Sequence, residues 1–150
     1  MEYFVRPMER ADLDVCAVIE QSAGDPWSLA QLSEELENQL AGGASRLFVA
    51  QAPGQSVAGL AAWQLAAGEA SLYTLTVAPE ARRTGAGTAL LHQSLEALRG
   101  EGAEVAFLEV RASNAGAIAL YEQAGFVADG RRPRFYQNPT EDAVLMHRAL

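Results

Sequence analysis

The stretch from Val77 to Leu91 (VAPEARRTGAGTALL) constrains the fold more than any other part of the sequence. A β-type run ends at Val77, Pro79 interrupts it, and glycines at positions 85 and 87 precede a run with helical apolar spacing. Glycine tolerates positive φ and has no Cβ, so main-chain N–H groups can gather around one point. The following helix begins with unpaired N–H groups and a partial positive charge. The stretch therefore predicts an anion site, most often for phosphate, between a strand and a helix.

Arg82 and Arg83 would add fixed positive charge beside that site. A bare G-x-G is weak evidence, however, and an ordinary glycine-containing loop with two solvated arginines is its more common explanation. Leu90 stands where the dinucleotide motif G-x-G-x-x-G needs its third glycine, and the Gly-Lys-Ser/Thr of a P-loop occurs nowhere. A phosphate bound here therefore belongs to a ligand class other than dinucleotides or nucleoside triphosphates.

The bulk composition fits one globular domain spanning 1–150. The chain has 150 residues, 49% of them hydrophobic, and a net charge of −8, which argues against a general nucleic-acid binder and is compatible with a basic protein or peptide partner. The single cysteine, Cys16, excludes an internal disulfide and lies in a periodic run, so we expect a reducing compartment and a core position. With neither a signal peptide nor a membrane-spanning run in the sequence, we expect a cytoplasmic protein.

Apolar periodicity and turn residues divide the chain into alternating helices and strands. Helices are expected over 10–21, 29–40, the segment after the glycine loop, and 115–124, and strands over 3–6, 46–51, 57–65, 70–77, 104–110, from 126, and 143–148. Arg131 to Pro139 reads as a polar loop. The strand–helix–strand order of 70–77 and 104–110 predicts a parallel pair around a right-handed crossover. The sum is a mixed α/β domain with a largely antiparallel sheet.

Two of these strands carry further expectations. Strict alternation along 70–77 places Tyr73, Leu75 and Val77 on one face. Both faces of 104–110 are apolar apart from Glu109, which predicts a buried central strand. A carboxylate there must be paired, lie near solvent, or have a raised pKa that would suit a general base. A simple ion pair with Arg111 or another arginine explains Glu109 equally well.

Other side chains have a structural and a chemical interpretation side by side. The Tyr121 phenol could donate a proton to a leaving thiolate, although a core tyrosine in a helical stripe is the more common finding. Asn114 can cap a helix, and Trp27 can wedge between two helices. Because His92 and His147 have no second histidine or cysteine at ligand spacing, no metal site is expected.

The whole pattern resembles the GNAT superfamily of N-acetyltransferases. The acetyl-CoA signature of these enzymes, Arg/Gln-x-x-Gly-x-Gly/Ala, is matched by Arg82, Gly85 and Gly87 between a strand and a helix. A narrower match is to the RimI-type ribosomal-protein alanine N-acetyltransferases: LEVRASNAGAIA at 108–119, then LYEQAGF, and PWS at 26–28. The resemblance covers nearly the whole chain, and it implies a splayed parallel strand pair with helices on both faces of the sheet.

The resemblance also implies roles for individual residues. Glu109 would be the general base and Tyr121 the general acid. Acetyl-CoA would be held by the strand end, the glycine loop and one asparagine, which are Leu75, Thr76, Val77, Arg82, Arg83, Thr84, Gly85, Ala86, Gly87, Thr88 and Asn114. Trp27 and Tyr136 would lie on the acceptor side, where Phe135 and Pro133 depart from the family pattern and leave the peptide preference open.

The expected function is transfer of the acetyl group of acetyl-CoA to a protein N-terminal α-amine, on a small-subunit ribosomal protein with N-terminal alanine. An α-ammonium has a pKa of about 8 and a lysine about 10.4, so a carboxylate base is adequate for the former. Acetylation of a lysine or a small amine remains an alternative, as does a non-catalytic acetyl-CoA sensor. We expect no nucleic acid, membrane or metal as partner, and the sequence leaves the oligomeric state open.

Overall fold

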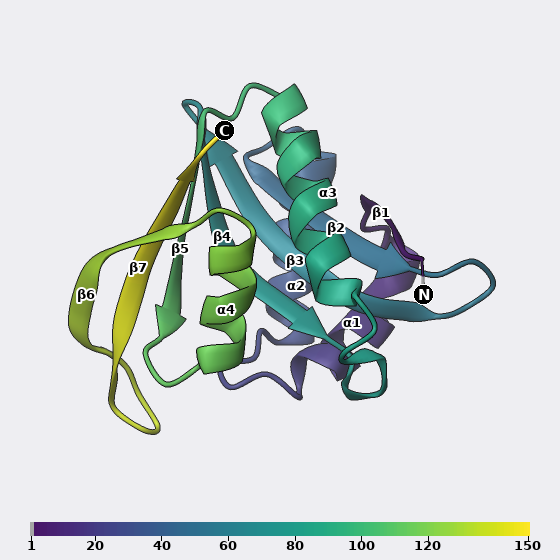
Figure 1. Cartoon of the computed structure of the whole chain (residues 1–150). Helices are drawn as coiled ribbons and strands as arrows, with labels where there is room; N and C mark the ends of the chain where they lie inside the picture. The colour runs from purple at the N-terminus through teal and green to yellow at the C-terminus, as the bar shows by residue number, and fades with distance from the viewer. Residues whose placement is uncertain (1) are drawn as a thin grey trace.

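The structure, a computed structural model, describes residues 2–150 and shows one seven-stranded sheet in the order β1-β2-β3-β4-β5-β7-β6 (Figure 1). The strands are β1 Phe4–Pro7, β2 Ser45–Gln51, β3 Val57–Ala66, β4 Glu69–Val77, β5 Val105–Arg111, β6 Val127–Tyr136 and β7 Glu141–Ala149. The helices are α1 Leu13–Glu20, α2 Leu29–Leu40, α3 Ala86–Gly100 and α4 Ala115–Gln123, with 3-10 turns η1 at Arg10–Asp12 and η2 at Pro79–Ala81.

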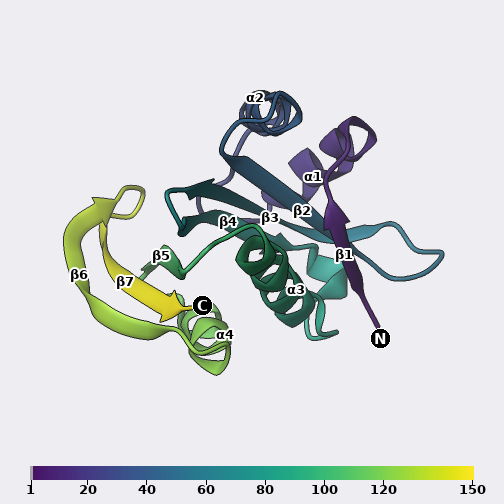
Figure 2. The ribbon, with the colours of Figure 1, turned by 90° about the horizontal axis from the view of Figure 1, so that it is seen from above.

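Helices cover both faces of this sheet, as expected. Figure 2 shows α1 and α2 on one side and α3 and α4 on the other. The apolar stripe of α3 is buried on β2, β3 and β4, and the indole N–H of Trp63 on β3 donates to Ser94 Oγ of that helix at 3.1 Å. At the start of α2, Ser28 Oγ accepts from the Gln31 N–H at 3.1 Å and confirms the expected N-cap. None of the helices in the described residues is both long and apolar enough to cross a membrane.

The parallel pair is formed by β4 and β5, and it diverges. Its ladder runs from Glu69↔Val105 to Leu72↔Leu108 and ends there. Beyond that point β4 stays paired with β3 up to Val77, while β5 stays paired with β7 up to Arg111. The expected parallel and splayed pair is therefore confirmed, and the sheet opens between the two strands.

Two sequence expectations about the second half of the sheet are wrong. The segment from Arg131 to Tyr136 is part of the edge strand β6, and only the residues between Tyr136 and Glu141 form the turn to β7. The sequence of β6 shows no apolar alternation because this strand is exposed along nearly its whole length, and Pro133 lies where the register shifts. Strand β5 is central, but it is not buried on both faces: Phe107 is 39% exposed. Helices α1 and α2 contact β2, β3 and β4 instead and leave this face open.

Candidate active site

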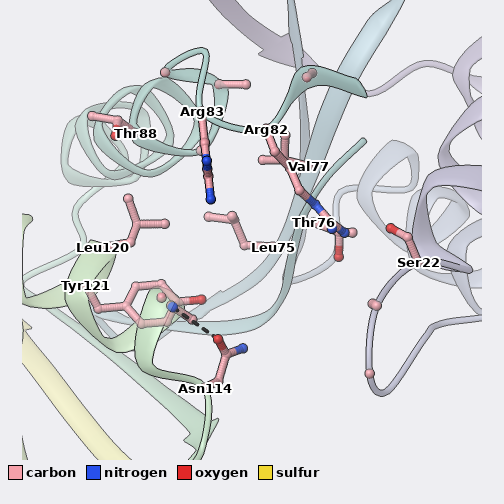
Figure 3. A pocket seen from close by; sticks show the side chains of 18 residues that line it. Ser22, Leu75, Thr76, Val77, Arg82, Arg83, Thr88, Asn114, Leu120 and Tyr121 are labelled. Carbon is pink, nitrogen blue, oxygen red and sulfur yellow. Dashed lines mark hydrogen bonds between the residues drawn. The ribbon is translucent and has the colours of Figure 1, made fainter. Parts of the chain in front are cut away.

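A cleft of about 580 Å3 opens on the α3/α4 side of the splayed strands (Figure 3). The end of β4, the glycine loop, the first turn of α3, helix α4 and the segment after α1 form its walls. The lining comprises Ser22, Ala23, Gly24, Leu75, Thr76, Val77, Ala81, Arg82, Arg83, Gly85, Ala86, Gly87, Thr88, Asn114, Gly116, Ala117, Leu120 and Tyr121. With the single exception of Thr84, every cofactor residue expected from the sequence lies in this wall.

The glycine loop turns its main chain toward the cleft. Gly85, the N-cap of α3, has φ of 93°, and Arg83 also has positive φ, 62°. A Cβ on Gly85 would meet nothing within 4 Å, so open space adjoins the first N–H groups of a fifteen-residue helix. This is the geometry of an anion site at a helix N-terminus. Thr84 supports the loop from behind, because its hydroxyl bonds the Ala81 carbonyl and lies 2.7 Å from the Tyr3 hydroxyl.

Gly87 keeps the cleft open between its walls. A Cβ built there would point between Val77 on β4 and Leu120 on α4, 3.5 Å from a methyl carbon of each. Any larger side chain would fill the passage that a long, narrow ligand would use. Figure 3 shows the Arg83 side chain extending toward the space between Leu75 and Leu120, which adds positive charge to the same passage. The residues therefore fit a ligand with a diphosphate and an extended arm.

Helix α4 supplies two of the predicted residues. Asn114 Oδ1 accepts from the Ala117 N–H at 3.1 Å, so this side chain both caps the helix and lines the cleft. Tyr121 is only 7% exposed, packs edge-on against Phe126 at 6.0 Å between ring centroids, and points its ring into the cleft (Figure 3). Burial raises the pKa of Tyr121 to about 12, with a smaller contribution from Tyr136. The phenol therefore keeps its proton throughout the physiological pH range.

A second cavity, of about 710 Å3, lies on the other side of the opened strands. We call it the groove. Phe107 and Glu109 reach it from the face of β5 opposite to Ala106 and Val110, which are buried. Leu108 of β5 and residues of β4, β6 and β7 complete its wall, and these are Glu69, Ser71, Leu72, Tyr73, Asp129, Arg132, Phe135, Tyr136, Leu145 and Met146.

Strict alternation along β4 fails at Tyr73. The pairing with β3 shifts between Ala62 and Trp63, which oppose Thr74 and Leu72, so Tyr73 is the extra residue of a bulge. Tyr73 consequently lines the groove, whereas Leu75 and Val77 line the cleft. Because of this bulge, β4 contributes side chains to both cavities.

Glu109 lies at the point where β4 and β5 separate, one residue beyond their last pair. Its side chain is 32% exposed, and Oε1 lies 3.4 Å from Nη1 of Arg132 on β6. The carboxylate is thus paired and near solvent, and its partner is Arg132 in place of Arg111. An exposed ion pair of this length is weak and leaves the carboxylate able to exchange partners.

Tyr136 links the two candidate acid–base residues electrostatically. Burial and, after it, the negative charge of Glu109 are the two largest effects that together raise the pKa of Tyr136 to about 12. Tyr136 in turn raises the pKa of Tyr121. Because Tyr121 lines the cleft and Glu109 lines the groove, the two residues approach the opening between β4 and β5 from opposite sides of the sheet.

Trp27 and Glu20 contact residues that line the two cavities. Within residues 2–150 neither cavity lining includes Trp27, whose ring centroid lies 6.3 Å from that of Tyr73. Glu20 is fully buried and accepts from the Trp27 N–H at 2.8 Å and from the hydroxyls of Thr74 and Thr76 at 2.9 and 2.5 Å. Sequence reasoning missed Glu20 as part of the site; its only signal was a place beside Ile19 in the apolar spacing of the first helix.

Comparison with known proteins agrees with this geometry. The model of the acetyltransferase (GNAT) family matches residues 13–126. This chain belongs to the GNAT acetyltransferase family. It is 36% identical over 145 residues to the [ribosomal protein bS18]-alanine N-acetyltransferase of Escherichia coli K12, covering 95% of this chain and 94% of that one. It is also 33% identical to the N-alpha-acetyltransferase RimI of Mycobacterium tuberculosis, covering 94% and 89%.

The GNAT fold is equally clear from solved structures. The crystal structure of the ribosomal-protein-S18-alanine N-acetyltransferase from Escherichia coli superposes with a TM-score of 0.86 at 34% identity, covering 99% of this chain and 94% of that one. The mixed sheet with one parallel pair, expected from the sequence, is therefore the GNAT architecture.

Proposed function

We propose that the protein transfers the acetyl group of acetyl-CoA to the α-amine of a protein N-terminus. The first candidate acceptor is a small-subunit ribosomal protein with N-terminal alanine, the substrate class in the names of its relatives. One observation carries the proposal: the cleft and the groove reach the opening between β4 and β5 from opposite faces, with Tyr121 on one side and Glu109 on the other. Such an arrangement lets two substrates meet end to end.

On this proposal, the cleft holds acetyl-CoA. The N–H groups from Arg83 to Thr88 face its diphosphate, with the two arginines adding charge, and Asn114 contributes from α4. The pantetheine arm passes Gly87, where a Cβ would stand between Val77 and Leu120. Bound in this way, acetyl-CoA supplies an activated thioester at the opening of the strands.

Each catalytic side chain then has one task. Glu109, directly or through a water, removes a proton from the acceptor ammonium so that the free amine can attack the thioester carbonyl. The Val77 main chain lies at the strand end, where an N–H group can stabilise the oxyanion. Tyr121 holds its proton because burial raises its pKa to about 12, and it delivers that proton to the departing thiolate. Trp27, through Tyr73, and Tyr136 shape the acceptor side.

The α-amine suits these groups better than a lysine does. At a common pH, deprotonating a lysine costs roughly 3 kcal/mol more than deprotonating an α-ammonium. Glu109 is partly exposed and paired with Arg132, and a carboxylate is adequate for the acceptor that is easier to deprotonate. Protein N-termini of this kind are made in the cytoplasm. The cytoplasm is also the reducing compartment expected for an enzyme with a single cysteine.

Mass spectrometry of peptides incubated with acetyl-CoA tests the proposal. One peptide has a free N-terminal alanine and an internal lysine, and its matched control carries the same sequence with a blocked N-terminus. We expect one acetyl group on the α-amine of the first peptide and none on the control. Acetyl on the lysine of both peptides would establish the side-chain alternative, and coenzyme A binding without any turnover over a panel of N-termini would establish the sensor.

A further inference from the structure

Arg111 makes more contacts than any single ion pair requires. It lies two residues after Glu109 on β5, and its side chain is 14% exposed. Nε and Nη2 donate to the two carboxylate oxygens of Asp25 at 2.9 and 2.8 Å, and Nη1 donates to Glu141 at 3.2 Å. Nη1 and Nη2 also donate to the carbonyls of Pro139 and Gln137 at 2.9 and 2.7 Å.

These contacts join two segments that are far apart in sequence. Asp25 lies between α1 and α2, 86 residues from Arg111, whereas Gln137 and Pro139 belong to the turn between β6 and β7 and Glu141 is the first residue of β7. Glu141 also accepts from the Ser113 N–H at 2.7 Å, so the turn that leads from β5 to α4 is hydrogen-bonded to the same cluster. Hydrogen bonds from Ser113 and Arg111 hold the pKa of Glu141 below its ordinary value, so it remains charged at neutral pH.

The same guanidinium fixes a side chain of the groove. Its central carbon lies 4.6 Å from the ring centroid of Tyr136. Tyr136 lines the groove, and Ser22, Ala23 and Gly24, which directly precede Asp25, line the cleft. One arginine therefore sets the position of an aromatic wall on the acceptor side and of a segment that borders the cofactor side.

We propose that Arg111 is a positioning residue for the acceptor, holding the 21–28 segment, the 137–140 turn and the ring of Tyr136 in one arrangement beside Glu109. A planar guanidinium can serve two carboxylates, two carbonyls and a ring face at once, and a lysine ammonium cannot. The glycine loop that would bind the diphosphate lies outside this cluster. The proposal rests on the proposed acetyl transfer to an α-amine, but the arrangement itself can be measured without an acceptor.

The experiment compares Arg111→Lys with Asp25→Ala. Arg111→Lys keeps the positive charge but loses the planar, forked guanidinium. Asp25→Ala removes a half-exposed carboxylate and leaves the ion pair between Arg111 and Glu141 in place. The matched control is Arg10→Lys, because Arg10 and Glu37 form a bidentate pair of 2.8 Å bonds between η1 and α2, away from both cavities. For each protein the measurements are kcat, the KM of the acceptor peptide, the Kd of coenzyme A by calorimetry, and amide exchange of 21–28 and 137–140.

We expect Arg111→Lys to raise the acceptor KM by about tenfold or more and Asp25→Ala to raise it by a smaller factor, because misplaced positioning groups weaken productive binding. The Kd of coenzyme A should change by no more than about twofold, since none of the hydrogen bonds of Arg111 reaches the glycine loop whose main-chain N–H groups would bind the diphosphate. Amides of both segments should exchange faster in both variants, and Arg10→Lys should match the wild type in every measurement.

Unchanged acceptor KM and unchanged exchange in both variants would overturn the proposal. So would a loss of coenzyme A affinity as large as the rise in acceptor KM, because that pattern indicates general loosening of the fold. A wild-type protein that acetylates no α-amine contradicts the proposed function instead, and the exchange data then decide by themselves whether Arg111 holds the two segments.

Discussion

The cleft and the groove are built from different parts of the chain. The predicted anion-binding end of the cleft comes from one continuous stretch, 82–88, and its proposed binding groups are main-chain N–H groups beside two glycines. The groove takes its wall from four strands, β4 to β7, and its polar contacts are between side chains such as Glu109 and Arg132. One is a local structure that a short motif can encode, and the other exists only when the sheet is complete.

This difference determines how each cavity responds to substitution. Main-chain N–H groups survive most changes of side chain, so the cleft is sensitive mainly at positions that need positive φ or no Cβ. Side-chain contacts depend on the exact residue, so substitutions in the groove should change the preference for an acceptor without changing the affinity for the cofactor. The following substitutions test that division, from the largest expected effect to the smallest.

Glu109→Gln should damage the chemistry while leaving the cleft intact. An amide cannot accept the ammonium proton, so we expect kcat to fall by about 10²- to 10⁴-fold, the usual contribution of a general base. The Kd of coenzyme A should stay within about twofold, since Glu109 lines the groove and not the cleft. Steady-state kinetics and calorimetry measure both. Glu104→Gln, an exposed change just before β5, is the matched control; equal activity of the two variants would remove Glu109 from the mechanism.

Tyr121→Phe should lower kcat by about 10- to 100-fold, less than Glu109→Gln, because a thiolate can depart without being protonated whereas an ammonium cannot attack the thioester until it loses a proton. The pH profile sharpens this prediction. Burial raises the pKa of Tyr121 to about 12, so the phenol stays protonated below that pH and loses its proton only as pH rises through it. The ratio of wild-type to Tyr121→Phe activity should therefore be constant from pH 7 to 10.5. A ratio that falls toward one near pH 10 would show an ordinary, accessible tyrosine.

Gly85→Val should weaken coenzyme A binding by about tenfold and leave the acceptor KM unchanged. A β-branched residue strongly disfavours the φ of 93° seen here, and its Cβ would occupy the open space beside the helix N-terminus. Calorimetric titration with coenzyme A measures the effect. Gly100→Ala, where a Cβ meets nothing within 4 Å and φ is ordinary, is the control and should bind normally. Normal binding by Gly85→Val would place the diphosphate elsewhere.

Asn114 has a structural and a binding role that two substitutions can separate. Asn114→Ala removes the N-cap of α4 and should lower the free energy of unfolding by about 1 kcal/mol, measured by denaturant titration. Asn114→Ser keeps a capping oxygen and should retain most of that stability. Both variants lose the amide and should weaken coenzyme A binding by a few-fold. If Asn114→Ser binds as the wild type does, the cap is the whole role of this residue.

The parts of the site that could be predicted from the sequence are those with local causes. Gly85 and Gly87 between a strand and a helix indicate an anion site, although a bare G-x-G is weak evidence for one, and the Ser28 cap needs only its own helix. Glu109 and Tyr121 were ambiguous as isolated residues. Their candidacy came from a resemblance spanning 108–126, and the structure then placed them on opposite sides of one opening.

What could not be predicted has causes outside the local sequence. The bulge at Tyr73 is a mismatch in register with β3, which no property of 70–77 by itself reveals. The strand at 131–136 forms because β7 offers it a partner, despite a polar sequence with a proline. The exposure of Phe107 depends on which strands α1 and α2 cover.

By itself, the sequence determined the order of elements, the parallel pair and the glycine loop, because periodicity, turn residues and main-chain geometry act over a few neighbouring residues. The tertiary structure alone decided that β4 and β5 separate just before Glu109, that Arg132 is the partner of this carboxylate, and that Arg111 joins Asp25 to Glu141. These pairings link residues up to 86 positions apart. Only the assembled sheet brings such residues together, since each contact depends on the registers of the strands between them.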